Sequence, residues 1–211
     1  MTSESADSVL ALDGVTRRFG AVAALREVDL EVHTGESVLV AGPNGAGKST
    51  LLRIACGLTR PTSGAVRIHG EAHRRGVPAS ARARIGYLGH QSFLHAHLTA
   101  RENLALYARL YGAGTESRAA VDVWLERVGL SRAGDRVIAG FSRGMMQRLA
   151  LARTLIHRPA LLMLDEPATG LDAEGREMLV GLVGELQDEG VTLLLVTHQL
   201  ELGLRLASRV A

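Results

Sequence analysis

Residues 42–50 read GPNGAGKST and match the pattern G-x-x-x-x-G-K-[ST], a glycine-rich turn that holds a phosphate between a strand and a helix. The context fits, because residues 37–41 form an apolar run typical of a buried strand and residues 51–58 predict a helix. Glycines let backbone N–H groups point at one phosphate, and the helix N-terminus adds positive potential. The motif therefore predicts an α/β fold with a phosphate site. A plain glycine turn is the alternative, and the full match disfavours it.

The loop also supplies side chains. Lys48 is the only lysine in the chain, although lysine and arginine together number 24, so this position indicates a need for a compact ammonium that reaches terminal phosphates. Ser49 offers a hydroxyl oxygen to Mg²⁺. The predicted nucleotide-binding residues of the loop are Gly42, Pro43, Asn44, Gly45, Ala46, Gly47, Lys48, Ser49 and Thr50.

Two carboxylates follow a second apolar run. Residues 160–164 are continuously apolar, which predicts a parallel strand covered on both faces and placed next to the strand of the loop. Asp165 then emerges at the carboxyl end of this strand, where ligands bind in open α/β sheets, and is the expected Mg²⁺ ligand. Glu166 is the expected general base that orients the attacking water. A solvated acidic turn is the alternative for either residue alone.

A third predicted strand, residues 191–198, ends in His198. Alone, a histidine at a strand end is more often structural. Since three strand ends of one parallel sheet meet at the same edge, His198 is instead expected to contact the terminal phosphate.

Residues 141–145 (FSRGM) predict a second helix start that could bind an anion. Ser142 is the predicted N-cap, and Gly144 would allow close backbone approach to an anion at the positive end of the helix. Arg143 stands between them and either adds positive charge there or points to solvent.

Together these segments resemble the nucleotide-binding domain of ABC (ATP-binding cassette) ATPases over nearly the whole chain. The resemblance implies that residues 42–49 are the Walker A motif and residues 161–165 the Walker B motif, with Glu166 the catalytic glutamate and His198 the switch histidine. It further implies that Gln91 in GHQS senses the γ-phosphate and Mg²⁺, that Asp172 in TGLD belongs to the D-loop, and that Phe19 in RRFG stacks on adenine.

The family signature LSGGQ is matched imperfectly by FSRGM. Arg143 replaces a glycine and Met145 replaces a glutamine. The resemblance implies that Ser142, Arg143, Gly144 and Met145 bind the γ-phosphate held by a second nucleotide-binding subunit, which makes a homodimer the expected assembly.

The fold class expected from the motifs and the resemblance is α/β: a P-loop NTPase (RecA-like) core of the ABC ATPase type, with an antiparallel β layer and an inserted α-helical subdomain. Residues 1–8 are expected to be a disordered tail and residues 9–211 a single domain. Residues 9–91 and 141–211 would form the core with its antiparallel layer, which the alternation of Val28, Leu30 and Val32 indicates. Residues 92–140 would form the helical subdomain, where Thr99 and Glu102 predict a capping box.

Composition narrows the setting. The net charge of +2 is too small to argue for nucleic acid, and the single cysteine, Cys56, permits no intramolecular disulfide. The first eight residues lack the features of a secretory signal, and no run reaches the ~18 apolar residues of a membrane span. Any membrane role would therefore be peripheral. His95 and His97 are expected in a solvated loop, with metal or haem ligation as the alternative.

The resemblance implies an ATP hydrolase that uses ATP and Mg²⁺ and that sits on permease subunits at the cytoplasmic face of the inner membrane. A soluble ABC ATPase acting on DNA or ribosomes is the alternative, but the short interval between Gln91 and Phe141 leaves no room for the long coiled coil of the chromosome ATPases. Residues 85–112 are similar to haem-exporter ATP-binding subunits of cytochrome c maturation, which suggests haem export; another ABC transporter is the alternative. The family usually continues one or two strands further, so the chain either lacks a C-terminal segment or is naturally short.

Overall fold

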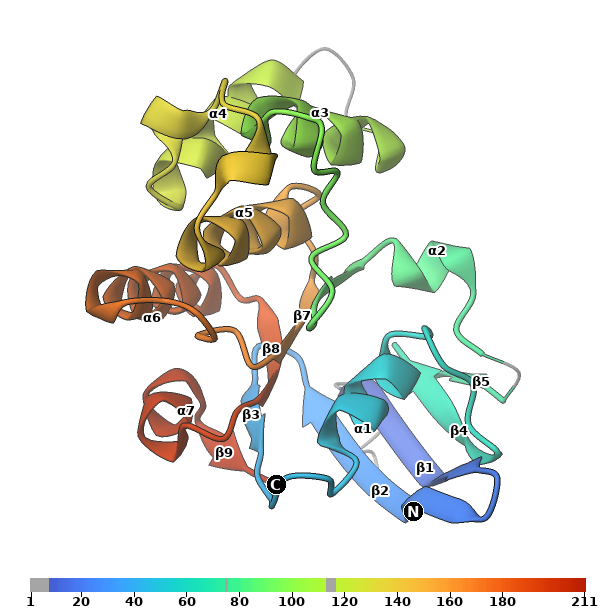
Figure 1. Ribbon diagram of the computed structural model, residues 1–211. Helices are drawn as coiled ribbons and strands as arrows, with labels where there is room; N and C mark the ends of the chain where they lie inside the picture. Colours follow the sequence, from blue (N-terminus) through green and yellow to red (C-terminus); the bar gives the residue numbers. More distant parts are fainter. Residues whose placement is uncertain (1–7, 75, 113–116) are drawn as a thin grey trace.

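Two β-sheets build the molecule, with α1 (Lys48–Ala55) beside the antiparallel sheet and most other helices grouped over the parallel one (Figure 1). The structure is a computed structural model that describes residues 8–74, 76–112 and 117–211. Residues 1–7 of the tail expected at residues 1–8, and residues 113–116 within the expected helical subdomain, lie outside the described residues.

The antiparallel sheet has the strand order β2-β1-β4-β5, with strands β1 (Ser8–Phe19), β2 (Val22–His33), β4 (Ser63–Ile68) and β5 (Glu71–His73). Ser8, expected in the tail, already belongs to β1 and lies opposite His33 of β2. Val32 is buried, and Val28 and Leu30 are partly buried against the same core. The predicted antiparallel layer is therefore confirmed.

The second sheet is parallel and has the order β6-β7-β8-β3-β9, formed by β3 (Ser37–Val40), β6 (Ile85–Leu88), β7 (Leu161–Asp165), β8 (Thr192–Val196) and β9 (Arg209–Val210). Every residue of β7 and β8 is buried, as continuous apolar runs predict. One expectation was wrong: β8 lies between β3 and β7, so the strand that ends at Asp165 is not the immediate neighbour of the strand before the loop.

Two hydrophobic cores lie on opposite faces of the parallel sheet. Along β7, Leu161 and Met163 join one core, whereas Leu162 and Leu164 join the other, because successive side chains of a strand point to opposite faces. The first core also contains residues of the antiparallel sheet and of α1 (Lys48–Ala55). The second contains residues of α6 (Ala173–Asp188) and of the helices above it.

Those helices form the expected helical region: α3 (Ala100–Leu110), α4 (Ser117–Arg127), the 3₁₀ turns η1 (Ser131–Ala133) and η2 (Ile138–Gly140), and α5 (Arg143–Leu155). The capping box at the start of α3 is present, since Thr99 Oγ1 accepts from the N–H of Glu102 and Glu102 accepts from the N–H of Thr99. The predicted apolar face of the next helix is buried, namely Val121, Trp124, Leu125 and Val128. Two short helices complete the fold, α2 (Ala79–Arg82) and α7 (Leu200–Leu206).

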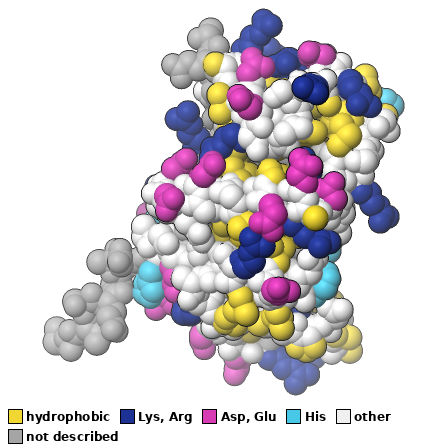
Figure 2. Space-filling model, turned by 90° about the vertical axis from the view of Figure 1, so that its left-hand side faces the viewer, with side chains coloured by type: hydrophobic (Ala, Val, Ile, Leu, Met, Phe, Trp, Pro, Cys, Tyr) yellow, Lys and Arg dark blue, Asp and Glu magenta, His cyan; other side chains and the backbone are white. Residues whose placement is uncertain are grey.

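The molecular face that carries α6 and α7 mixes acidic, basic and apolar side chains (Figure 2). Arg205 on α7 forms two hydrogen bonds with Glu177 on α6, at 2.7 and 2.8 Å, and Arg127 on α4 pairs with Glu185 on α6 at 2.6 Å. These ion pairs link neighbouring helices at the surface. Within the described residues, no helix is long and apolar enough to span a membrane.

Candidate functional site

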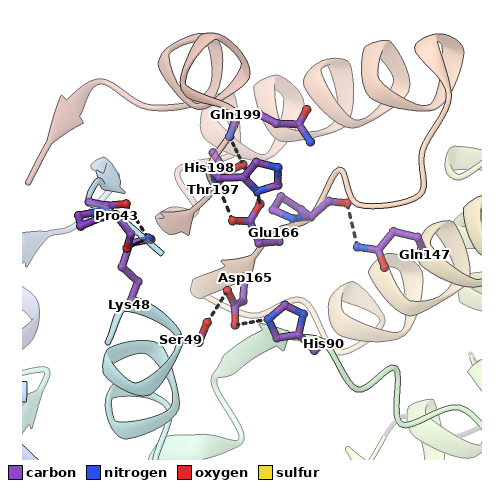
Figure 3. A network of polar contacts seen from close by, with 12 residues as sticks. Pro43, Lys48, Ser49, His90, Gln147, Asp165, Glu166, Thr197, His198 and Gln199 are labelled. Atoms are coloured by element: carbon purple, nitrogen blue, oxygen red, sulfur yellow. Dashed lines mark hydrogen bonds and ion pairs between the residues drawn. The ribbon is translucent and has the colours of Figure 1, made fainter. Parts of the chain in front are cut away.

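The carboxyl ends of the parallel strands converge on one cavity of about 440 Å³. From the loop after β3, six residues line it: Asn44, Gly45, Gly47, Lys48, Ser49 and Thr50. From the other strand ends come His90, Glu166 and His198. Segments more than a hundred residues apart in the chain therefore meet at the edge where ligands bind in open α/β sheets (Figure 3).

The loop backbone is shaped for an anion. Gly47 has φ of 88° and is the N-cap of α1, so the first N–H groups of the helix are not used by a capping side chain. A Cβ atom at Gly47 would lie 2.3 Å from the carbonyl oxygen of Ala24 on β2, which excludes any other residue. The helix N-terminus thus faces the cavity with free donors, as a phosphate site requires.

Lys48 folds back over the loop. Its Nζ donates to the carbonyl oxygens of Gly42 and Pro43, at 2.7 and 2.8 Å (Figure 3). The ammonium is therefore held at the rim of the cavity without a carboxylate partner among the described residues. A bound phosphate would supply the missing negative charge.

Asp165 is the deepest acidic group of the site. It is 2% exposed, and its Oδ1 accepts a hydrogen bond from Ser49 Oγ at 3.0 Å. Its Oδ2 is buried and has no hydrogen-bond partner among the residues that the structure describes. Burial raises the pKa of Asp165, and the hydrogen bond from Ser49 opposes that rise. An unsatisfied buried carboxylate oxygen beside a serine hydroxyl fits the oxygen ligands that Mg²⁺ prefers.

Glu166 is oriented by the end of the neighbouring strand. Its Oε2 accepts from Thr197 Oγ1 at 3.0 Å and lies 2.8 Å from His198 Nδ1, while Oε1 accepts from the N–H of His198 at 2.8 Å. The backbone of Glu166 has φ of 53°, an uncommon conformation for a residue other than glycine, and its N–H donates to Val196 O. The carboxylate is thus fixed at the cavity, where a general base would have to lie.

His90, rather than Gln91, faces this acidic centre. The imidazole Nε2 lies 3.8 Å from Asp165 Oδ2 and lines the cavity, whereas Gln91 is exposed and does not line it. The strand pairing ends at Leu88 opposite Leu164, so the path of the chain after β6 decides that His90 faces Asp165. The role assigned to Gln91 stays a prediction, and His90 is a site residue that motif matching missed.

The predicted signature residues lie away from this cavity in the same chain. Ser142 is the N-cap of α5, as predicted, and its Oγ accepts from the N–H of Met145 at 3.2 Å. Arg143 is exposed, and a Cβ on Gly144 would come 3.1 Å from the carbonyl oxygen of Gly170. The absence of a side chain at Gly144 therefore lets the start of α5 lie close to Gly170.

The two remaining predicted residues also lie outside the cavity lining. Asp172 caps α6 by accepting from the N–H of Gly175 at 2.8 Å, and this hydrogen bond lowers the pKa of Asp172. Phe19 is 52% exposed at the end of β1, with the Arg17 guanidinium carbon 4.5 Å from its ring centroid. An exposed aromatic ring is compatible with adenine stacking, which stays a prediction.

Two polar residues that the sequence did not single out complete the network. Thr197 bridges Glu166 and the turn before α7, because its Oγ1 also accepts from the N–H of Gln199 at 3.1 Å. Gln147 on α5 donates to the carbonyl oxygen of Pro167 at 2.8 Å and so joins the signature helix to the residue after Glu166. The only signal for either was its proximity to a recognised motif.

Comparison with known proteins gives consistent matches. A family model described as ABC transporter matches residues 25–169. The chain is 42% identical over 207 residues to the daunorubicin resistance ATP-binding protein DrrA3 of Streptomyces coeruleorubidus. This alignment covers 98% of this chain and 65% of the relative. It is 37% identical to the ABC transporter ATP-binding protein NatA of Bacillus subtilis (strain 168), over 92% of this chain and 80% of the relative.

A solved structure has the same fold. It is the dimeric structure of a post-hydrolysis state of the ATP-binding cassette MJ0796 bound to ADP and Pi, with a TM-score of 0.87 and 31% sequence identity. The superposition covers 95% of this chain and 92% of that chain.

Proposed function

This chain belongs to the ABC transporter family, and from that membership we propose that it is the ATP-binding and ATP-hydrolysing subunit of a membrane transporter. One observation carries the proposal: the buried Asp165 carboxylate, which has one unsatisfied oxygen, accepts a hydrogen bond from Ser49 of the phosphate loop, and Ser49 lines the same cavity as Lys48 and Glu166. A fold alone would not require these groups to converge.

In the proposed reaction the loop positions the triphosphate of ATP. The N–H groups at the start of α1 and the ammonium of Lys48 bind the phosphate oxygens, and Lys48 exchanges its carbonyl partners for the ligand. Ser49 and Asp165 would hold Mg²⁺, which neutralises charge on the phosphates when bound. Phe19 would stack on the adenine ring.

Glu166 then orients the attacking water and accepts its proton. Its carboxylate is already fixed by Thr197 and by both the N–H and the Nδ1 of His198. A hydrogen bond from His198 Nδ1 to the carboxylate requires a proton on Nδ1. Nε2 would then accept from the attacking water, or donate to a phosphate oxygen when it also carries a proton. A base held in place before substrate binds loses little entropy when the reaction begins.

A second copy of the chain would complete the site. Ser142, Gly144 and Arg143 lie at the positive end of α5 but do not line their own cavity, so they can act only on a nucleotide held by a partner subunit. The dimeric state of the similar cassette MJ0796 supports a homodimer. Within each subunit, Gln147 would connect the signature helix α5 to Pro167, the residue that follows Glu166.

The partner that couples hydrolysis to transport would be an integral membrane permease, which would hold the subunit at the cytoplasmic face. An apolar cavity of about 280 Å³ lies between the end of α1, β6 and α3, with Leu58, Phe93 and Tyr111 exposed at its rim. Exposed aromatic and aliphatic side chains around a cavity are typical of a docking surface. We propose this surface as the permease contact.

The proposed direction is export, and haem for cytochrome c maturation is the cargo that we propose. The support for this cargo is the similarity of residues 85–112 to haem-exporter subunits. The names of the relatives given above do not mention haem. A motor subunit does not touch the cargo, so the neighbouring permease gene is the first test. Deletion of the gene that encodes the present chain should abolish holo-cytochrome c. A normal level of holo-cytochrome c in that strain would contradict haem as the cargo.

ATP hydrolysis is tested directly with an Asp165→Asn variant. Phosphate release from ATP with Mg²⁺ should fall at least about 100-fold, while the metal-free protein should unfold at an equal or higher temperature, because the substitution removes a buried charge. The control is Asp188→Asn, an exposed residue at the end of α6. Hydrolysis that survives in Asp165→Asn would overturn the assigned site. Coupling is tested by co-expression, since the chain should fractionate with membranes only together with its permease.

A further inference from the structure

The wall of the cavity beside Asp165 carries an imidazole nitrogen that could ligate a metal ion. His90 follows β6, its side chain is 71% exposed, and its Nε2 lies 3.8 Å from the unsatisfied Oδ2 of Asp165. Figure 3 shows the imidazole and Ser49 on either side of the Asp165 carboxylate. Three potential ligand groups from three segments therefore surround one point next to the phosphate loop.

The spacing suits ligation of one ion by His90 and Asp165. Two ligand atoms, each about 2.1 Å from a metal, lie about 3.0 Å apart at a right angle and about 3.4 Å apart in a tetrahedron. The observed 3.8 Å exceeds these distances by about 0.8 and about 0.4 Å, respectively. Because His90 is largely exposed, a small rotation of its side chain closes that difference without moving the strand.

The other nearby groups are already engaged. Both oxygens of Glu166 accept hydrogen bonds from Thr197 or His198. Among the described residues, no group of three histidine, cysteine or acidic side chains could hold an ion unaided. Oxygen atoms from a bound nucleotide would have to complete the coordination, so the ion should bind together with the nucleotide and weakly without it.

We infer that His90 ligates the divalent ion bound with the nucleotide, and that this imidazole shifts the site from Mg²⁺ toward first-row transition ions such as Mn²⁺. The inference rests on the proposed function. Its chemical reason is that Mg²⁺ prefers oxygen ligands, whereas an imidazole nitrogen binds transition ions more strongly. Ser49 and Asp165 supply the oxygen ligands.

The test uses Mn²⁺ as the probe, with the non-hydrolysable ATP analogue AMP-PCP. Protein labelled with [¹⁵N]histidine should show ¹⁵N modulation of the Mn²⁺ electron spin echo, and unlabelled protein should show ¹⁴N in its place. His90→Gln should remove the histidine signal and reduce the ratio of Mn²⁺ to Mg²⁺ affinity at least about tenfold. His198→Ala removes the other histidine that lines the cavity and should retain the signal, because the ion pair with Asp165 Oδ2 is formed by His90 and not by His198.

The outcomes separate the two proposals. Mn²⁺ bound with AMP-PCP but without histidine modulation would overturn the role of His90 and leave the proposed ATPase intact. A signal that survives in His90→Gln and disappears in His198→Ala would identify His198 as the ligand. That result would also overturn the role of His90. If a fluorescent nucleotide does not bind with any metal, the proposed function itself fails.

Discussion

His198 contacts Glu166 through two different atoms, because its backbone N–H donates to Oε1 at 2.8 Å and its Nδ1 lies 2.8 Å from Oε2. A ring-only contact would leave the carboxylate free to rotate, whereas the added backbone bond fixes both oxygens. Glu166 is joined to Val196 by its own N–H, so the ends of β7 and β8 are locked together at the site. The orientation of the Glu166 carboxylate, the proposed base, is therefore set by the ends of β7 and β8.

Replacing Glu166 by glutamine tests this base. Glu166→Gln keeps the shape and one carbonyl oxygen but cannot accept a proton, so kcat should fall at least about 100-fold while the affinity for Mg-ATP stays within a few-fold. In the presence of ATP, the variant should also accumulate as a dimer on gel filtration, since the ATP-bound dimer cannot hydrolyse its nucleotide. Glu126→Gln, at an exposed position on α4, is the control. An unchanged kcat would place the base elsewhere.

Lys48 offers a second test, because its ammonium lies between two loop carbonyl oxygens at 2.7 and 2.8 Å. The larger, planar guanidinium of Lys48→Arg cannot occupy this space in the same way. We expect nucleotide affinity or turnover to fall at least tenfold, which corresponds to about 1.4 kcal/mol. Arg26→Lys, an exposed position on β2, is the reciprocal control. Wild-type hydrolysis by Lys48→Arg would contradict the assigned role.

The fold was predictable where the sequence pattern is local. Continuous apolar runs predicted β7 and β8, and the capping box at Thr99 predicted the start of α3, because each depends on neighbours along the chain. Strand order depends on which strands pair across the sheet, which explains why β8 was not expected between β3 and β7.

The site shows the same division. The loop and Asp165 were predictable from motifs that demand particular residue types at fixed spacing. The choice between His90 and Gln91 depends on the direction in which the chain turns after Leu88, where the pairing of β6 with β7 ends, and the spacing of the motif residues does not determine that direction. Thr197 became recognisable only when its hydroxyl was seen to contact Glu166.

Folding stability should depend on pH through His157. This imidazole stacks on Tyr111 with ring centroids 3.8 Å apart, and its Nε2 lies 3.2 Å from Ile85 O. Burial lowers the pKa of His157 in the folded protein, so the folded state holds the neutral ring while the unfolded chain takes up a proton below pH ~6.5. The free energy of unfolding should therefore be fully retained above that pH and decrease as the pH falls toward the lowered folded value.

Urea unfolding at pH 7.5 and pH 5.5 measures this effect. His157→Phe keeps an aromatic ring against Tyr111 and removes the titrating group, so its stability should decrease less between the two pH values than that of the wild type. His97→Phe, at an exposed loop position, is the control. Burial also lowers the pKa of His69, but His69 is present in all three proteins and cancels in the comparison. Equal losses in the wild type and His157→Phe would contradict the role of His157.

The start of α5 provides the last test. If Ser142 and Gly144 face a phosphate held by a second subunit, Gly144→Asp should leave nucleotide binding by the monomer within a few-fold and abolish ATPase activity. Like charges at about 4 Å repel by roughly 1 to 4 kcal/mol, depending on the local dielectric. The added Cβ would also lie 3.1 Å from Gly170 O of the same chain, so shape and charge must be separated. Gly144→Ala adds the same Cβ without a charge and is the matched control.

Dimerisation with ATP, measured in the Glu166→Gln background, distinguishes the causes. Loss in Gly144→Asp with retention in Gly144→Ala would identify charge repulsion, whereas loss in both would identify displacement of residues 169–172. Arg143→Gly should dimerise and hydrolyse ATP normally if this exposed side chain only meets solvent; a large loss of kcat would show that Arg143 contributes positive charge to the partner's transition state. If Gly144→Asp dimerises as well as its parent, FSRGM is only a helix start, because a carboxylate at that position could not then face a phosphate.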